Sequence, residues 1–442
     1  MPEIENFVYL MMENHSWDHV FGTLQRGGHD GLPLDSNGEP MTLVPQRYAN
    51  GSIQRLYKMP KTCSGKANGP SQNWESSHNQ WNFGAMDGWA IGGEQDKPTS
   101  LGYYTEDHLP VFHSLGKVFP INDRCHASTL AQTWPNRIFA FAGSARGIVK
   151  TGQTDDLVNV EYPNGIIVNH FDEHNISWTN YALPGSPGTL EHLFLNVSDE
   201  LDRKHFKKFP EDFLLDAQKG TLPQFTFIDY NGSFQSMEPP QNVVEGEKVV
   251  WEVVTALMKG PKWSKTALVL TFDEHGGLYD HVPPAPAIRP DNVEPIIPAD
   301  FRNNTAWTQY LAYDKYSFTG FRIPLLFISP YGKKDHISHV LHDHSSILSF
   351  LEHKFNLPAL TCRDANANPL FDLLDFDAME RKKPNFPGSV WKQLSPPTTN
   401  PEYVNCTSDD PGMLPPPGTV VDDGTCSGPD FAPNPCGMGL YL

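Results

Sequence analysis

Continuous apolar runs alternate along this chain with segments in which apolar residues recur every three or four positions. Residues 7–12 and 266–272 are runs of apolar and β-branched residues, the pattern of strands that are buried on both faces. Residues 224–229 form a shorter run that ends in an acid, and residues 245–259 show the spacing of an amphipathic helix. The order strand, helix, strand predicts a parallel pair and therefore an α/β fold.

Other segments complete the predicted core. Pro135 belongs in the first turn of a helix, and Gly143 belongs at the end of the same helix. Pro324 restricts the run that contains it to a strand that starts there or lies at an edge of the sheet. Further helices are expected over residues 107–119, 135–143, 210–218 and 343–351, and further strands over residues 166–168 and 323–330.

The expected organisation is one catalytic domain over residues 1–385, followed by a Pro-rich wrapping or loose tail over residues 386–442. Long loop insertions are expected at about 26–105 and 285–320. The first insertion includes the tryptophan-rich segment 74–89, which has two interpretations. It is a lid packed by its own aromatic side chains, or it contacts substrate, and both interpretations stay open.

Polar residues follow predicted strands, or open predicted helices, at four places. The carboxyl ends of parallel strands meet at one edge of a sheet, where open α/β sheets bind their ligands, so these side chains are expected to converge. Carboxylate and amide oxygens suit Ca²⁺, Mg²⁺ or Mn²⁺, and the adjacent histidines extend the choice to Zn²⁺ or Fe. The four places are Glu13 with Asn14, Thr133, Asp273 with Glu274, and Asp343 with His344.

Thr133 is the candidate nucleophile of this set. It lies at the N-terminus of a predicted helix, where free backbone N–H groups and the helix dipole favour an anion. A hydroxyl at that place is positioned to attack phosphorus, and a metal beside it would lower its pKa. The alternative is that Thr133 only caps the helix.

Composition and charge limit the classes of function. With 442 residues and 38% hydrophobic content, the chain is long enough to bury a large core. The net charge of −19 argues against nucleic acid as a partner, because binding its phosphates requires clustered Lys and Arg. No apolar run approaches the roughly 20 residues that span a bilayer, and the first residues do not resemble a signal peptide. The chain is expected to be cytoplasmic, or secreted after loss of a leader.

Neither the disulfide pattern nor the oligomeric state follows from the sequence. Three of the six cysteines lie in the Pro-rich tail, at Cys406, Cys426 and Cys436. These three could pair among themselves or with the cysteines at 63, 125 and 362, and spacing does not decide between these pairings.

Four motifs together resemble a known family. Residues 12–22, 133–137, 271–284 and 343–346 look like the motif series of the phosphoesterase family, in matching order and with similar spacing. That family contains phosphatidylcholine-hydrolysing phospholipases C and related acid phosphatases. The resemblance extends from residue 5 to about residue 358, so it covers most of the chain except the tail.

The resemblance implies an alkaline-phosphatase-like α/β/α sandwich of three layers with a mostly parallel central sheet. It also implies hydrolysis of phosphoric esters through a phosphothreonine at Thr133, with the help of one divalent metal ion. By matching position, the metal ligands would be Glu13, Asn14, Asp273 and Glu274. Asn136 and Arg137 would hold the start of the helix, and Asp343 with His344 would support the site.

The chain departs from the family pattern at two positions. Gln72 and Glu238 stand where many members carry histidines that are thought to contact the phosphoryl group or to help proton transfer. The proton donor for the leaving group is therefore expected among His78, His281 and His275. For each of these histidines, a structural role is the alternative.

Two classes of function follow. The first is a metal-dependent phosphoric ester hydrolase that acts on phospholipids, with transient contact to a membrane surface, or on small phosphomonoesters. The second is a non-catalytic member that binds a phosphorylated ligand, which the replacements at Gln72 and Glu238 favour.

Overall fold

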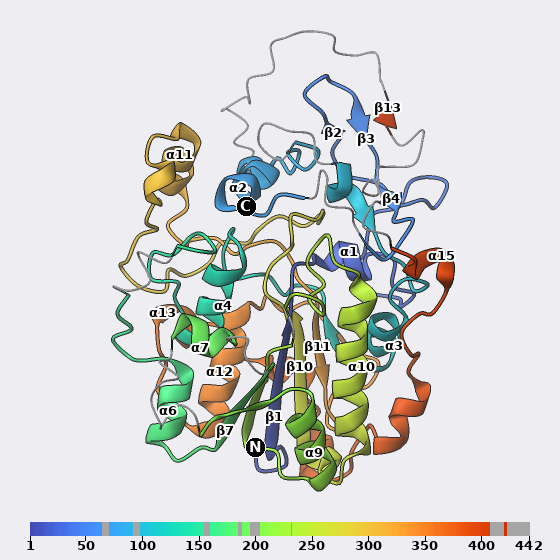
Figure 1. Cartoon of the computed structure of the whole chain (residues 1–442), viewed down its shortest axis with the longest axis vertical. Helices are drawn as coiled ribbons and strands as arrows, with labels where there is room; N and C mark the ends of the chain where they lie inside the picture. Colours follow the sequence, from blue (N-terminus) through green and yellow to red (C-terminus); the bar gives the residue numbers. More distant parts are fainter. Residues whose placement is uncertain are drawn as a thin grey trace.

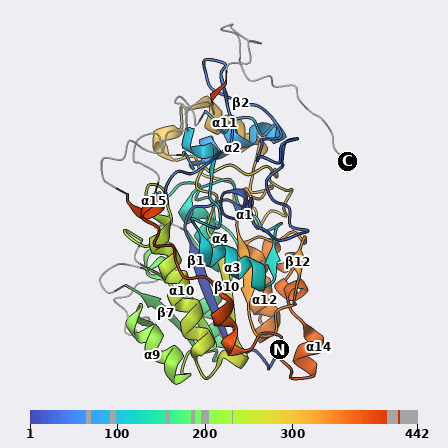
Figure 2. The ribbon, with the colours of Figure 1, turned by 90° about the vertical axis from the view of Figure 1, so that its right-hand side faces the viewer.

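The computed structural model describes residues 1–63, 70–91, 98–153, 160–183, 188–194, 204–230, 232–406 and 420–421. Within these residues, eight strands form a central sheet in the order β12-β6-β11-β10-β1-β9-β7-β8. Helices cover both faces of this sheet (Figures 1 and 2). The expected three-layer α/β/α sandwich is thus confirmed.

The centre of the sheet is parallel, as predicted. Strands β1 (Asn6–Met12) and β10 (Thr266–Phe272) pair in parallel over their whole length. On the other side of β1 follow β9 (Phe225–Ile228), β7 (Trp178–Ala182) and β8 (Phe206–Lys208), all parallel. All residues of β1 and β10 are buried, which explains the uninterrupted apolar runs, because helices cover both faces.

One strand beyond β10 runs in the opposite direction. Strand β11 (Leu325–Ile328) pairs antiparallel with both β10 and β6 (Ile121–Asn122), and β12 (Ile337–Ser338) pairs in parallel with β6. Pro324 immediately precedes β11, so its missing N–H removes no bond from the interior of the strand. The sheet is therefore mostly parallel with one reversed strand.

The long helices form the outer layers. One layer contains α10 (Val243–Lys259), α3 (Pro110–Val118) and α9 (Glu211–Lys219), and α10 packs against the other two. The other layer contains α4 (Thr133–Ala142) and α12 (His344–Phe355), which pack against each other. The predicted helices are present within a few residues of their expected bounds.

The strand expected over residues 166–168 is wrong, because this segment opens helix α6 (Ile167–Glu173). The Asn169 side chain accepts from the Ile166 backbone N–H at 2.8 Å and fixes the first turn. Ile167 and Phe171 are both buried, four residues apart, which is the spacing of a helix face. A run of three β-branched residues was too short to separate a strand from the start of a helix.

The two insertions form a cap over the carboxyl end of β1 and β10 (Figures 1 and 2). Helix α2 (Trp74–Trp81) of the first insertion packs against α11 (Thr305–Tyr313) of the second. The Trp307 indole N–H donates to Glu75 at 3.0 Å. Trp74 and Trp89 are fully buried, so these two side chains pack the cap.

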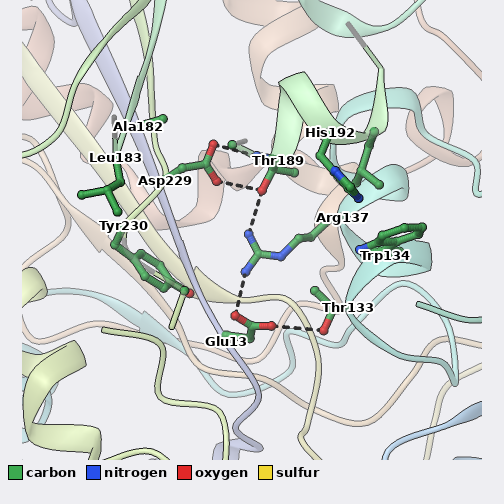
Figure 3. Close-up of a pocket in the computed structure, with 13 residues that line it drawn as sticks. Glu13, Thr133, Trp134, Arg137, Ala182, Leu183, Thr189, His192, Asp229 and Tyr230 are labelled. Carbon is green, nitrogen blue, oxygen red and sulfur yellow. Dashed lines mark hydrogen bonds and ion pairs between the residues drawn. The ribbon is translucent and has the colours of Figure 1, made fainter. Parts of the chain in front are cut away.

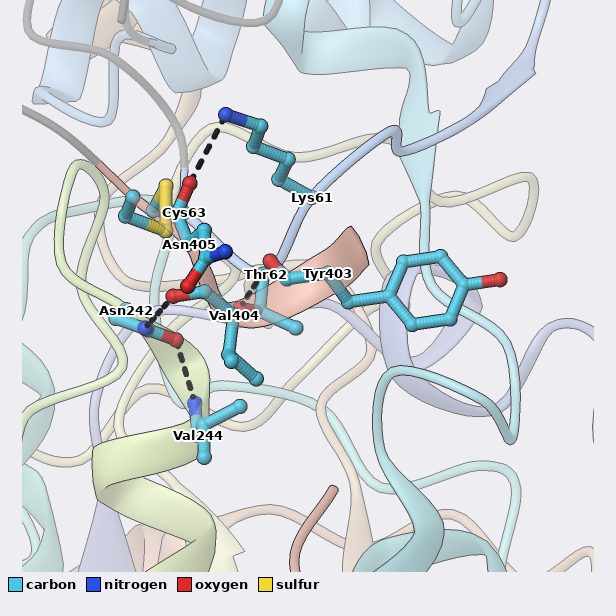
Figure 4. The surroundings of a disulfide bond; sticks show 9 residues. Lys61, Thr62, Cys63, Asn242, Val244, Tyr403, Val404 and Asn405 are labelled. Atoms are coloured by element: carbon cyan, nitrogen blue, oxygen red, sulfur yellow. Dashed lines mark hydrogen bonds between the residues drawn. A yellow bond between two sulfur atoms is a disulfide. The ribbon is translucent and has the colours of Figure 1, made fainter. Parts of the chain in front are cut away.

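The segment that follows residue 386 runs along α10 and then reaches the cap. Within it, a 3-10 helix (Gly388–Gln393) packs against α10. A disulfide joins Cys406 to Cys63 of the first insertion, and the Thr62 N–H donates to the Tyr403 carbonyl at 3.1 Å (Figure 4). The spacing of the cysteines did not predict this pairing, and Cys426 and Cys436 lie outside the described residues.

The remaining elements are short. The helices are α1 (Trp17–Phe21), α7 (Thr189–Leu193), α13 (Cys362–Ala365), α14 (Phe376–Glu380) and α15 (Pro401–Val404). The strands are β2 (Gln46–Arg47), β3 (Ile53–Gln54), β4 (Tyr57–Lys58), β5 (Gly102–Tyr103) and β13 (Val420–Val421). None of the helices in the described part of the chain combines the length and the apolar character that a membrane span requires.

Candidate active site

The two central strands deliver their polar ends to one point. Met12 lies opposite Phe272 in the β1–β10 register, so the acidic residues that follow the two strands are neighbours. The Asn14 N–H donates to Asp273 Oδ1 at 3.1 Å. Asn14 takes the left-handed backbone conformation with φ 68°, which asparagine tolerates better than most residues. The predicted convergence of these strand ends is therefore present.

Thr133 reaches the same point from helix α4, of which it is the first residue. Its hydroxyl donates to Glu13 Oε1 at 3.3 Å (Figure 3). The loop before the helix is held by Asn136, whose amide donates to the Ala131 carbonyl at 2.9 Å and accepts from the Thr129 N–H at 3.0 Å. Asn136 thus fixes the place at which the helix starts.

Arg137 was expected to hold the start of the helix, but its side chain extends into the site instead. Its Nε donates to Asp273 at 3.0 Å, and its Nη1 donates to Thr189 Oγ1 at 3.1 Å. Its Nη2 lies 3.9 Å from Glu13. Asp229 accepts from both the Thr189 N–H and its hydroxyl, at 2.9 and 2.7 Å. Figure 3 shows these side chains as one line of contacts from Asp229 to Thr133.

These residues, with the exception of Asp273, border a cavity of about 180 Å³. His192 also lines it, and its ring meets the Trp134 ring edge to face at 4.9 Å between centroids. Most of the residues that line this cavity were not predicted from the sequence. Asp229 could have been predicted, because it is an acid that directly follows strand β9, whereas no sequence pattern marked the short helix α7. The cavity is lined by Glu13, Thr133, Trp134, Arg137, Ala182, Leu183, Gly188, Thr189, His192, Leu193, Asp229, Tyr230 and Gly232.

Carboxyl groups outnumber guanidinium groups at this point. Burial raises the pKa of Asp273 to about 7, with Glu13 adding to the effect and Arg137 opposing it. Burial and the Asp273 charge also raise the pKa of Glu274 well above its ordinary value. Carboxyl groups whose pKa values are raised in this way become charged more readily when a further cation binds beside them.

The oxygen atoms of the site fit a divalent metal ion. Asn14 Oδ1 and Glu274 Oε1 are buried without a hydrogen-bond partner among the described residues, which is rare for buried polar atoms unless an ion or water satisfies them. The other Glu274 oxygen accepts from the Gly276 N–H at 2.7 Å. Carboxylate and amide oxygens together suit hard cations such as Ca²⁺, Mg²⁺ or Mn²⁺.

Gln72 and Glu238, the two departures from the family pattern, lie together beside this oxygen set. Gln72 Nε2 donates to Glu238 Oε1 at 3.0 Å. Asn14 Nδ2 donates to Gln72 Oε1, also at 3.0 Å. Burial and the nearby Glu13 charge raise the pKa of Glu238.

His78 and His275 are held away from the cavity by their own partners. His78 is fully buried, with Nδ1 at 2.7 Å from the Trp74 carbonyl and Nε2 at 3.2 Å from Asp314. His275 Nε2 lies 2.8 Å from Gln80, and its Nδ1 lies 3.2 Å from Glu274. Neither histidine lines the cavity that contains Thr133.

His281 belongs to a separate buried ion network. Burial lowers its pKa, but the carboxylates of Asp18 and Asp30 outweigh burial and raise the pKa to about 10. Asp18, Asp280 and His281 lie close enough together to hold a metal. The Arg322 guanidinium already fills that role, because it donates to Asp280 at 2.9 Å and to Asp18 at 3.0 Å.

Asp343 and His344 stand behind the site and do not line the cavity. Asp343 caps helix α12 and pairs with Arg363 at 2.9 Å. His344 Nε2 lies 2.9 Å from the Phe272 carbonyl, and its Nδ1 lies 3.1 Å from Ser128 Oγ. His344 therefore links the end of β10 to the loop that leads to α4.

Comparison with known proteins places the chain in a family. The model of the phosphoesterase family matches residues 4–358. Phospholipase C B of Mycobacterium tuberculosis is 28% identical over 432 residues, which cover 87% of this chain and 80% of that protein. The non-hemolytic phospholipase C of Pseudomonas aeruginosa is 28% identical over 390 residues, which cover 81% of this chain and 54% of that protein.

Solved structures show only a distant likeness. A Vibrio parahaemolyticus protein of the alkaline phosphatase superfamily is 11% identical, with 72% of each chain covered and a TM-score of 0.34. The family match carries the assignment, since it includes both central strands and the segment that leads to α4. The chain belongs to the phosphoesterase family and is a hydrolase of phosphoric esters.

Proposed function

We propose that this chain is a metal-dependent phosphoric ester hydrolase of the phospholipase C type, which acts through a phosphothreonine at Thr133. The observation that carries the proposal is the position of the Thr133 hydroxyl. It lies at the start of α4, donates to Glu13, and borders the same cavity as Arg137. The nucleophile, a positive charge and a cavity that can hold a phosphoryl group therefore lie at the same place.

In the first step, Thr133 Oγ1 attacks phosphorus and the bond from phosphorus to the leaving oxygen breaks. Glu13 accepts the hydrogen bond of the hydroxyl, orients it, and takes its proton as the bond to phosphorus forms. Arg137 and the N-terminus of α4 stabilise the charge on the phosphoryl oxygens. A divalent ion held by Glu13, Asn14, Asp273 and Glu274 would lower the pKa of the attacking hydroxyl and polarise a phosphoryl oxygen.

We assign the proton transfers to His192, the one histidine among the described residues that line the cavity. In the first step His192 donates a proton to the departing alkoxide. In the second step His192 takes a proton from the water that attacks the phosphothreonine, and Glu13 returns its proton to the departing Thr133 oxygen. The bond from phosphorus to that oxygen breaks, which releases phosphate or a phosphorylated head group and restores Thr133. The same group acts as acid and then as base, as microscopic reversibility requires.

A phospholipid is the favoured substrate class, and a soluble phosphomonoester is the other. The cavity lining includes the apolar side chains of Trp134, Leu183 and Leu193 and the ring of Tyr230, which suit contact with the glycerol end of a lipid. The relatives reported above are phospholipases C by name. The net charge of −19 favours a zwitterionic lipid over an anionic membrane surface.

The proposal is tested by assaying the purified chain with p-nitrophenyl phosphate, p-nitrophenyl phosphorylcholine and phosphatidylcholine vesicles. Each assay is run with added Mg²⁺, Ca²⁺, Mn²⁺ or Zn²⁺, and again after treatment with a chelator. The expected result is turnover that chelator abolishes and one of the metals restores. Unchanged turnover after thorough chelation would contradict the metal requirement.

The second candidate function is binding of a phosphorylated ligand without turnover. The observation that favours it is the Gln72–Glu238 pair, which places an amide and a carboxyl group where the resemblance to the family leads us to expect histidines. Under this reading none of the substrates above is hydrolysed with any metal, while inorganic phosphate still binds in the cavity.

A further inference from the structure

A chain of two hydrogen bonds leads from Glu238 to the side chain of Asn14. Glu238 Oε1 accepts from Gln72 Nε2 at 3.0 Å, and Gln72 Oε1 accepts from Asn14 Nδ2 at 3.0 Å. Gln72 belongs to the cap, whereas Glu238 precedes helix α10. The relay therefore connects two segments that are far apart in the sequence with the end of strand β1.

The chemistry of the three groups fixes the direction of this relay. An ionised carboxylate can only accept hydrogen bonds, so Glu238 requires the NH₂ group of Gln72. The Gln72 carbonyl oxygen is then left for Asn14, which must supply its own NH₂ group. The remaining polar atom of the Asn14 amide is its oxygen, which is buried and has no hydrogen-bond partner in the part of the chain that the structure describes.

The backbone of Asn14 has no freedom to change this arrangement. Its N–H is bound to Asp273, and its positive φ of 68° sets the turn after β1. On the other side, a Cβ atom at Gly276 would lie 2.2 Å from the Asn14 carbonyl oxygen, so this loop packs directly on the turn. Rotation of the side-chain amide is the movement left, and the relay determines it.

We propose that Gln72 and Glu238 are positioning residues that hold the Asn14 amide oxygen toward the divalent cation of the site. This inference rests on the proposed function, because it assumes that Asn14 is a metal ligand. It gives the two replaced positions a role in metal affinity and none in proton transfer. Partners of this kind typically change metal affinity by about 10–100-fold when they are removed.

The test is the variant Glu238→Gln, which keeps the shape of the side chain but no longer dictates the direction of the relay. The dissociation constants of Mn²⁺ and Ca²⁺ are measured by calorimetric titration at pH 8, together with the melting temperature without metal. The expected result is affinity about 10–100-fold weaker, with a nearly unchanged metal-free melting temperature. Glu245→Gln, at a half-buried position in the first turn of α10, removes the same charge and serves as the matched control.

A swapped double variant separates direction from charge. In Gln72→Glu with Glu238→Gln, the acceptor-only group contacts Asn14 directly, so the Asn14 oxygen is again left free for the cation. The expected result is affinity within about threefold of the wild type, since the direction of the relay decides the affinity. Affinity as weak as that of Glu238→Gln alone would overturn the relay, because the charge at Glu238 would then be the cause.

The wild-type titration distinguishes the two levels of the proposal. If the wild type binds a cation and Glu238→Gln binds it with the same affinity, the relay is overturned and the proposed function stays intact. If no cation binds the wild type, both the metal site and the relay are overturned.

Discussion

Thr133 combines three properties in one side chain: it is the first residue of α4, it contacts Glu13, and it borders the cavity. We predict that Thr133→Ala lowers kcat by at least about 10³-fold on every substrate, because the covalent step is lost. Stability should change little, since Gln132 and not Thr133 is the N-cap. Steady-state kinetics and a thermal melt measure the two effects, and Thr133→Ser serves as the control that keeps a hydroxyl. Activity of Thr133→Ala near that of the wild type would remove Thr133 from the mechanism.

His192 is predicted to matter in proportion to how poor the leaving group is. His192→Ala should lower kcat for an alkyl phosphoester about 10²–10³-fold, because an alkoxide needs a proton in order to leave. The loss in the first-turnover release of p-nitrophenolate should be much smaller, because p-nitrophenolate leaves without protonation and the base role of His192 belongs to the second step. His174→Ala, an exposed histidine after helix α6, is the matched control. Equal losses in the first-turnover release of both leaving groups would argue for a packing role against Trp134.

The site residues differ in how far the sequence could predict them. Glu13, Asn14, Asp273 and Glu274 follow uninterrupted apolar runs, so the strand pattern alone placed them at one edge. The roles of the histidines were harder to predict from the sequence, because their partners come from distant segments that meet only in the folded chain. His78 meets Asp314, which lies 236 residues away, and no local pattern encodes that contact.

Helices α2 and α11 show how the two insertions become one cap. Trp307 is fully buried between them, whereas Tyr313 on the same helix is about half exposed. We predict that Trp307→Ala lowers the free energy of unfolding by about 3 kcal/mol, the usual cost of removing a buried Trp side chain. Tyr313→Ala should cost less than about 1 kcal/mol. Urea denaturation measures both, and equal effects would show that the cap is not held by this contact.

Strands and long helices were predictable because their patterns extend over many residues. Strand β1 is apolar from Phe7 to Met12, and α10 repeats its buried positions over four turns. The strand prediction for residues 166–168 was wrong, because three residues do not establish a period. The hydrogen bond from the Ile166 N–H to the Asn169 side chain stabilises a helix there instead. The disulfide to Cys406 was also beyond local patterns, since its partners are 343 residues apart.

The buried network around Arg322 links segments from across the whole molecule. It joins Asp18 of α1 and Asp30 of the first insertion to His281 and Asp280, which follow β10. The network lies apart from the cavity that contains Thr133, so we assign it to stability. It makes the stability of the molecule depend on pH.

The pKa of His281 is raised to about 10 in the folded state, from an ordinary value of about 6.5. The stability that His281 contributes is therefore fully present below about pH 6.5 and is lost as the pH rises through about 10. We predict that His281→Gln is less stable than the wild type at pH 6, by on the order of 2–4 kcal/mol, and that this difference shrinks toward pH 10. Urea denaturation at both pH values measures it. A difference that stays constant with pH would show that His281 is not protonated in the fold.

The covalent intermediate at Thr133 is the claim on which the proposed mechanism rests. It is tested by mixing the metal-loaded protein with p-nitrophenyl phosphate, quenching with acid during the first turnovers, and mapping the peptides by mass spectrometry. We expect a phosphoryl group on the peptide that contains Thr133, present early and lost as substrate is consumed. Release of p-nitrophenol while that peptide stays unmodified at every time point would contradict the mechanism.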